Sequence, residues 1–256
     1  MRTAITRAVS RSLDRCELGY LPRQPIDFQR ASQQHHGYEA CLAKLGLSII
    51  PLEPEHALPD AVFVEDTAVV VDEIAVSARP GAASRRPEVV SVARALSRYR
   101  PLGWIQAPAT LDGGDVIHAG RKLFVGASTR TNAEGIRQLA SHLEPYGYAV
   151  ETVQIRDCLH MKSACCYLGR QTILANRAWL DTAPFRDFRL LDVASDEPWA
   201  ANVLAIGETV VIPASFPATV RILDESGWNV RPLDVSELMK AEAGVTCMSL
   251  ILETGP

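Results

Sequence analysis

The residue type best suited to covalent chemistry near the C-terminus is a single cysteine, Cys247, within the segment AEAGVTCMSLILETGP. It follows a glycine-containing turn and precedes a short apolar run that is typical of a strand. Because free cysteine is among the most buried residue types, one interpretation is a small hydrophobic residue in a core. The other is a nucleophile held at a strand edge, which requires an activating base nearby.

Three carboxylates interrupt a strand-like apolar segment, LPDAVFVEDTAVVV (58–71): Asp60, Glu65 and Asp66. One interpretation is a strand end with solvated acids, because turn and cap positions commonly carry Asp. Carboxylates buried in such apolar surroundings instead need cationic or hydrogen-bonding partners. A planar guanidinium has five donors in a fixed fork and matches carboxylates that converge from one loop. The segment therefore indicates a cage for a cation.

Two further segments carry polar residues at expected strand entrances. In TLDGGDV (110–116), paired glycines permit close backbone approach beside flanking acids, but the lysine and serine of a phosphate-binding loop are missing. In LHMKSACC (159–166), His160 is a lone histidine, which is more often structural than catalytic. A nearby cysteine and an orienting acid would favour a catalytic base.

The cysteines and histidines do not predict a metal site or a cofactor. The six cysteines contain no C-x-x-C pair, and neither they nor the six histidines form a cluster at zinc spacing. We therefore expect no metal and no cofactor, and we expect Cys158, Cys165 and Cys166 to be packing residues.

A repeated pattern of elements positions these residues. Two β-rich runs flank a polar turn in residues 65–81, 113–129, 161–178 and 201–215, and a fifth pair is split between CMSLILE (247–253) and RTAITRAV (2–9). Apolar periodicity predicts helices over 29–45, 87–99, 132–145, 217–227 and 234–242, with N-caps at Asn132 and Asp234 and glycines at the ends. Strand-like runs follow four helices: LSIIPLE, WIQAPA, YAVETVQI and WNVRPLD.

A strand, strand, helix, strand unit that recurs at roughly 40 to 50 residues predicts an α/β fold built as a closed repeat. The N- and C-terminal strands would close the ring, and residues 1–256 would form a single catalytic domain. In such a ring, Asp66, Asp112, His160 and Cys247 occupy related positions, so they are expected to meet in one site.

Composition restricts the class of partner. The chain has 256 residues with a formal net charge of -4, which argues against nucleic acid. No apolar run approaches the roughly 18 to 20 residues of a membrane span, and the N-terminal residues lack a signal-peptide pattern. We expect a cytoplasmic protein that binds a small molecule, not a membrane, and a homodimer is left open.

The segments LPDAVFVEDTAVV, RPGAASRRPEV, TLDGGDV, FVGASTRTN, LHMKSACC and VTCMSLI occur in an order that resembles the dimethylarginine dimethylaminohydrolase family of the guanidine-modifying, or pentein, superfamily. The resemblance covers about residues 18–252. It implies a five-bladed α/β propeller and hydrolysis of Nω-methylated arginines to citrulline and an alkylamine through a covalent thiouronium.

The resemblance also implies a role for each matching residue. Cys247 would be the nucleophile, His160 the general acid and base, and Asp112 the residue that orients the imidazole. Superfamily relatives frequently have Glu where this chain has Asp112, whose side chain reaches less far. The remaining contacts to substrate would come from Leu18 on a mobile flap, Asp60, Phe63, Glu65, Asp66, Arg85, Arg130 and Ala241, with the two arginines holding the carboxylate.

Three alternatives stay open from the sequence. Arg86 competes with Arg85 for the carboxylate contact. A deiminase on the same fold would use the same cysteine, histidine and acids but release ammonia. A non-catalytic propeller that binds methylarginines is less favoured, because a binding module does not need a nucleophile.

Overall fold

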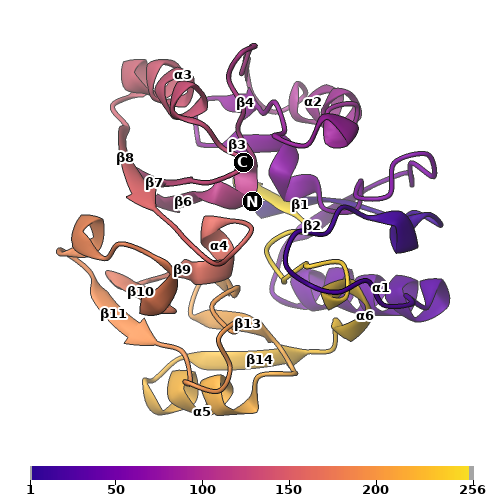
Figure 1. Cartoon of the computed structure of the whole chain (residues 1–256), viewed down its shortest axis with the longest axis vertical. Coiled ribbons are helices and arrows are strands. Elements are labelled where there is room, and N and C mark those ends of the chain that lie inside the picture. The colour runs from indigo at the N-terminus through magenta and orange to yellow at the C-terminus, as the bar shows by residue number, and fades with distance from the viewer. Residues whose placement is uncertain (1, 254–256) are drawn as a thin grey trace.

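Five separate three-stranded sheets form the framework of the protein in a computed structural model that describes residues 2–253. Figure 1 shows the sheets around the middle of the molecule, with α1, α2, α3 and α5 toward its periphery. Met1 and residues 254–256, the last residues of the predicted domain, lie outside the described part.

Each sheet has the same arrangement: its middle strand pairs antiparallel with one neighbour and parallel with the other. In spatial order, the sheets are β15 (Leu250–Glu253), β1 (Arg2–Arg7), β2 (Ser48–Leu52); β3 (Ala68–Val70), β4 (Ala75–Ser77), β5 (Leu102–Trp104); β6 (Val116–Ala119), β7 (Lys122–Ala127), β8 (Ala149–Gln154); β9 (Cys165–Gly169), β10 (Thr172–Ala175), β11 (Arg189–Asp192); and β12 (Leu204–Ile206), β13 (Thr209–Pro213), β14 (Asn229–Leu233).

Helices connect the middle strand to its parallel neighbour in four of the five sheets. The α-helices are α1 (Phe28–Lys44), α2 (Glu88–Leu96), α3 (Ala133–Leu143), α4 (Met161–Ala164), α5 (Pro217–Glu225) and α6 (Ser236–Met239). Short 3-10 helices, including η2 (Val64–Thr67) and η4 (Gly113–Asp115), precede β3 and β6. The parallel pairing requires these crossovers, because a tight hairpin joins only antiparallel strands.

The predicted hairpins and most helices are confirmed. Gly120, Gly169 and Gly207 adopt positive φ at the turns, where glycine has no steric penalty. Asn132 caps α3 by accepting a 2.8 Å hydrogen bond from the Gly135 N–H. The pairing of β1 with β15 confirms that the chain ends form one antiparallel pair.

Four features of the described elements differ from the prediction. The N-cap of α6 is Val235 and not the predicted Asp234. The side chain of Asp234 instead accepts a hydrogen bond from the N–H of Ser236, the first residue of α6. The strand predicted at WIQAPA begins earlier, at Leu102, and ends at Trp104, where its pairing with β4 stops. The sequence patterns also missed β11, which follows two 3-10 turns instead of a long helix. Cys247 lies in the loop before β15, not in the strand.

Apolar clusters between adjacent sheets and helices hold this framework together. One cluster joins the chain ends to the second sheet through Ile5, Val64, Ala68, Leu250 and Leu252. Among the described residues, no helix combines the length and hydropathy that a bilayer crossing requires.

Candidate active site

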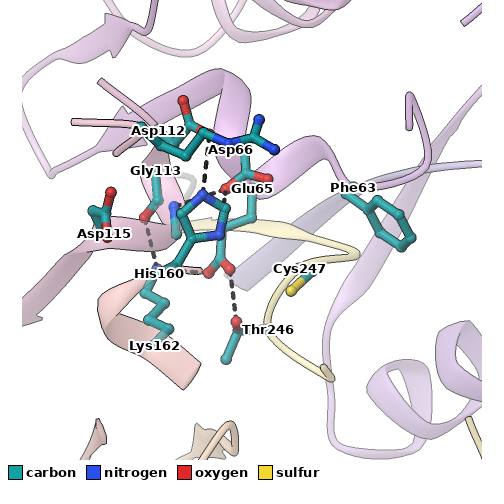
Figure 2. Close-up of polar contacts among 12 residues, drawn as sticks. Phe63, Glu65, Asp66, Asp112, Gly113, Asp115, His160, Lys162, Thr246 and Cys247 are labelled. Carbon is teal, nitrogen blue, oxygen red and sulfur yellow. Dashed lines mark hydrogen bonds and ion pairs between the residues drawn. The ribbon is translucent and has the colours of Figure 1, made fainter. Parts of the chain in front are cut away.

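Most of the predicted site residues line one small cavity. Its wall consists of Glu17, Asp60, Phe63, Asp66, Arg85, Arg130, Leu159, His160, Ala241, Glu242, Ala243 and Cys247. These residues come from loops at the ends of different sheets, so the fold brings together a cysteine, a histidine, carboxylates and arginines that are distant in sequence. Figure 2 shows Cys247, His160 and the acids of this region.

Cys247 is only partly buried, and its thiol is held by the loop that carries it. Its Sγ accepts a 3.3 Å hydrogen bond from the Gly244 N–H, while its carbonyl accepts one of 3.1 Å from the Glu65 N–H. Burial and the carboxylates of Glu65 and Asp66 raise the thiol pKa to about 12. Without a bound cation, Cys247 is therefore a neutral thiol near pH 7.

His160 is a buried residue directly before α4. Its Nε2–H donates to Asp112 Oδ2 at 3.0 Å, and its Nδ1 lies 3.8 Å from Asp66 Oδ1. Burial opposes the charged form, but Asp66 and the hydrogen bond to Asp112 outweigh it and raise the pKa of His160 to about 9. The imidazole is therefore cationic at neutral pH and can donate a proton.

Asp112 does not line the cavity but accepts a hydrogen bond from the imidazole of His160. Its Oδ1 accepts from the Gly81 N–H at 2.8 Å, and its own N–H donates to Thr131 Oγ1 at 3.1 Å. These bonds fix the carboxylate, so the short aspartate side chain still reaches the imidazole.

The paired glycines of TLDGGDV permit the close approach that the sequence predicts. A Cβ at Gly113 would lie 2.0 Å from the Glu65 carbonyl oxygen, and one at Gly114 would lie 2.7 Å from Asp66 Oδ1. The Gly114 N–H donates to the same Asp66 oxygen at 2.9 Å. Burial alone would raise the pKa of Asp66, but His160 and Arg85 lower it to about 2.

The two arginines of the cavity have different environments. Arg85 is buried and bonded to Asp66 at 2.5 Å and to Glu88 at 2.9 Å, so protein carboxylates already occupy its guanidinium. Arg130 Nη1 is a buried nitrogen without a hydrogen-bond partner among the described residues. Arg86 bonds to the Pro80 carbonyl and does not line the cavity. Of the two arginines that line this cavity, Arg130 is the one with a buried side-chain nitrogen that has no partner among the described residues.

The predicted flap, Leu18 and the LGYLPRQP stretch (18–25), and the adjacent Glu17 are hydrogen-bonded to the cavity wall at two points. The Glu17 N–H donates to Asp60 Oδ2 at 3.1 Å, and burial raises the pKa of Asp60. The backbone N–H groups of Gly19, Tyr20 and Leu21 all donate to the carboxylate of Glu242. Leu18 itself packs against a hydrophobic cluster and does not line the cavity.

Glu65 points its carboxylate away from the cavity that Cys247 lines. Its Oε1 accepts from Lys162 Nζ at 2.6 Å and its Oε2 from Thr246 Oγ1 at 2.6 Å (Figure 2). These three residues line a separate cavity of about 230 Å³. Burial raises the pKa of Glu65, and the partners at both oxygens oppose that rise.

A donor set that could hold a metal ion exists among the described residues: Asp66, Asp112 and His160, with ligand atoms within 4.8 Å of one another. However, the two carboxylates already accept hydrogen bonds from Gly114, Gly81 and His160. The cationic guanidinium of Arg85 also contacts Asp66, and it would repel a divalent ion.

Four lining residues were missed by the sequence reasoning: Glu17, Leu159, Glu242 and Ala243. Leu159 and Ala243 lie within motifs already singled out, next to His160 and near Cys247. The supporting Lys162 lies in the same LHMKSACC segment. Glu242 gave a weaker signal, because a glutamate between a helix and a turn is usually solvated.

Comparisons with known proteins point to one family, although no family model matches. The chain is 35% identical over 226 residues to the N(G),N(G)-dimethylarginine dimethylaminohydrolase of Pseudomonas aeruginosa, covering 88% of this chain and 89% of that protein. It is 35% identical over 252 residues to the protein of the same name from Streptomyces coelicolor, covering 98% and 97%.

Solved structures give the same result. The structure of DDAH from Pseudomonas aeruginosa, a cysteine-to-serine mutant complexed with citrulline, superposes with a TM-score of 0.93 at 33% identity over 98% of both chains. A histidine-to-glycine dimethylarginine dimethylaminohydrolase, an adduct with S-methyl-L-thiocitrulline, gives a TM-score of 0.93 at 34% identity over 98% of this chain and all of that one.

Proposed function

Because the chain belongs to the dimethylarginine dimethylaminohydrolase family, we propose that it hydrolyses Nω-methylated arginine to citrulline and an alkylamine. One observation carries the proposal: Cys247 and His160, whose imidazole is hydrogen-bonded to Asp112 outside the cavity, line one cavity together with acids and arginines. A nucleophile, a proton donor and a cage for a guanidinium are the groups that this reaction requires.

In the first half of the proposed reaction, the guanidinium binds beside Asp60 and Asp66. Its positive charge lies next to the thiol and favours ionisation, so the thiol releases its proton to solvent and the Cys247 thiolate attacks the guanidinium carbon. The tetrahedral adduct cannot expel an amine anion, so His160 protonates the leaving nitrogen and becomes neutral. The alkylamine leaves, and an S-alkylthiouronium remains on Cys247.

In the second half, water attacks the thiouronium carbon. Neutral His160 removes one proton from this water, and the C–S bond then breaks as the remaining hydroxyl proton passes to the sulfur, which gives citrulline and the Cys247 thiol and restores the imidazolium. Asp112 keeps the imidazole oriented through both halves. No step requires a metal or a cofactor.

The remaining binding residues are assigned by the same proposal. The free Nη1 of Arg130 supports a contact with the substrate carboxylate, whereas Arg85 would serve mainly to hold Asp66 in place. Buried Phe63 gives the cavity an apolar wall for methyl groups. Leu18, Glu65 and Ala241 complete the assigned set, with Leu18 acting through the flap and Glu65 through its backbone contact with Cys247.

The arrangement of the five sheets and the state of the cysteines bear on the whole molecule. We infer that the five sheets are the blades of a closed five-bladed propeller and that the chain is one catalytic domain; the shared sheet arrangement and the β1–β15 pair support both. All six cysteines are free thiols, which fits the reducing cytoplasm. The chain could also form a homodimer, as the sequence leaves open, and the molar mass in solution from light scattering tests this.

The test is to incubate the protein with asymmetric dimethylarginine, monomethylarginine and arginine, and to measure citrulline, alkylamine and ammonia. We expect citrulline and alkylamine from the methylated substrates, with Cys247→Ser as the inactive control. Packing of one methyl group against Phe63 should favour them over arginine by about 10- to 200-fold in kcat/KM. Equal or faster release of ammonia from arginine would replace this proposal with a deiminase.

A further inference from the structure

The loop that carries Cys247 is fixed by a buried amide from another part of the chain, Asn202. This residue lies just before β12 and is 7% exposed. Its Oδ1 accepts a hydrogen bond from the Thr246 N–H at 3.1 Å, and its Nδ2 donates to Thr246 Oγ1 at 3.1 Å. One side chain thus holds both the backbone and the hydroxyl of the residue before the nucleophile.

The hydroxyl of Thr246 continues this chain of contacts. Because Asn202 Nδ2–H occupies an acceptor position on Oγ1, the hydroxyl proton is directed to Glu65 Oε2 at 2.6 Å. The other Glu65 oxygen accepts from Lys162 (Figure 2). The Glu65 N–H donates to the Cys247 carbonyl. The nucleophile loop is therefore held from both sides.

Asn202 also packs directly against Gly244. A Cβ at Gly244 would lie 2.1 Å from Asn202 Oδ1 and 2.2 Å from its Cγ, so a side chain at position 244 would displace Asn202 from its hydrogen bonds with Thr246. The Gly244 N–H is the group that donates to Cys247 Sγ at 3.3 Å. Asn202 thus contacts the two residues, Gly244 and Thr246, whose groups lower the pKa of Cys247 against the effects of burial and nearby acids.

We propose that Asn202 is a positioning residue for the nucleophile. It holds Gly244 and Thr246 so that the Gly244 N–H faces Cys247 Sγ and stabilises the thiolate as it forms. This inference rests on the proposed function only in taking Cys247 as the nucleophile. Asn202 is not among the residues that line the cavity with Cys247, so its effect is expected in kcat and not in substrate affinity.

The experiment compares Asn202→Ala with the wild-type protein in two assays. The first is steady-state turnover of asymmetric dimethylarginine. The second is alkylation by iodoacetamide at fixed pH, followed by mass spectrometry of the peptide that contains Cys247. Because Asn202→Ala removes both hydrogen bonds that hold Thr246, we expect kcat and the alkylation rate to fall about tenfold while KM stays unchanged.

Asn176→Ala is the matched control. The Asn176 side chain donates to the Pro198 carbonyl, within the same connection that leads to Asn202, and accepts from the Ala178 N–H; its hydrogen bonds in the described part of the chain do not reach residues 244–247. This variant should keep the wild-type kcat and alkylation rate. If Asn202→Ala does not fold, Asn202→Asp retains the shape and the Oδ1 acceptor. Its carboxylate removes the donor and adds negative charge near the thiol, so both rates should fall further than in the alanine variant.

A double-mutant cycle tests whether Asn202 acts through Thr246. The combined effect of Asn202→Ala and Thr246→Val on kcat should be smaller than the product of the single effects, and Thr246→Ser should retain activity. Wild-type rates in Asn202→Ala, equal losses in the Asn176 control, or independent effects in the cycle would overturn the inference. If the wild type hydrolyses no methylarginine, the proposed function fails, but the alkylation assay still measures the positioning of Cys247.

Discussion

At the scale of single residues, the site pairs a neutral thiol with a cationic imidazole. The pKa of Cys247 is raised to about 12 and that of His160 to about 9, so His160 is already an imidazolium at neutral pH, whereas Cys247 is a thiol and not the thiolate of a preformed ion pair. The substrate guanidinium supplies the missing positive charge beside the thiol. Chemistry is thereby coupled to the binding of a cation, which limits reaction with other electrophiles.

The pH dependence follows from the charge of His160. As pH rises through about 9, His160 loses the proton that the leaving amine requires, so kcat/KM should fall. Asp112→Asn removes the charged acceptor at Nε2 and should move this falling limb to lower pH. The raised pKa also means that His160 stabilises the fold fully below about pH 6.5 and loses that contribution as pH rises through about 9. If the pH at which kcat/KM falls is the same in Asp112→Asn as in the wild type, Asp112 does not raise the pKa of His160.

The two arginines should respond differently to substitution. Arg130→Ala removes the free donor, so KM for methylarginine should rise by about tenfold or more, and binding of a decarboxylated analogue should change little. Arg85→Ala leaves buried Asp66 and Glu88 without their cation, so it should also lower the free energy of unfolding by about 3 to 5 kcal/mol. Inhibition constants for both ligands and urea denaturation measure these effects. Equal losses for the two ligands in Arg130→Ala would mean that this arginine serves structure.

At the scale of elements, the predicted flap is tied down mainly by one side chain. Glu242 adopts a positive φ of 59° and accepts backbone hydrogen bonds from Gly19, Tyr20 and Leu21. A non-glycine residue in this conformation is uncommon, and its neighbours Ala241 and Ala243 line the cavity. The same turn therefore fixes the backbone of residues 19–21 and the shape of the cavity wall.

Loss of the hydrogen bonds between Glu242 and the predicted flap should make the flap more mobile. Glu242→Ala removes the acceptor, so we expect a higher KM and faster tryptic cleavage after Arg23, which lies within the predicted flap. Glu225→Ala, at an exposed position at the end of α5, is the control and should change neither quantity. Limited proteolysis with and without citrulline measures the mobility of the flap. Unchanged cleavage and KM in Glu242→Ala would show that other contacts hold the segment.

Local sequence patterns predicted elements where periodicity is strong, and they failed where structure depends on distant partners. The hairpins and α1, α3 and α5 follow from alternation, caps and glycines. The strand β11 is short and half-exposed, so its pairing with β10 gives no local signal. The ties of Glu65 to Lys162 and of Asn202 to Thr246 span 97 and 44 residues, and only the fold brings these groups together.

At the scale of the whole molecule, pairing of the chain ends supports the site. Strand β15 follows the nucleophile loop and pairs with β1, while Leu252 packs in the cluster that contains Val64 of η2. The adjacent Glu65 donates its N–H to the Cys247 carbonyl. The position of the nucleophile therefore depends on contacts between the first and last strands of the chain.

Shortening a buried side chain in the cluster that contains Leu252 and Val64 should destabilise the whole fold. Leu252 is 3% exposed, so Leu252→Ala should lower the free energy of unfolding by about 2 to 5 kcal/mol. Val90 is 59% exposed on α2, and Val90→Ala should change stability by less than about 0.5 kcal/mol. Urea denaturation followed by circular dichroism measures both. Similar small effects in the two variants would mean that the β1–β15 pair adds little to stability.

The central claim is that Cys247 forms a covalent intermediate, and mass spectrometry of quenched enzyme tests it most directly. Wild-type protein mixed with asymmetric dimethylarginine and quenched in acid during turnover should carry a thiouronium adduct on the peptide that contains Cys247 and Met248. Cys247→Ser should form neither the adduct nor citrulline while it retains the wild-type circular dichroism spectrum. Citrulline production at the wild-type rate by Cys247→Ser, without an adduct in either protein, would contradict the account.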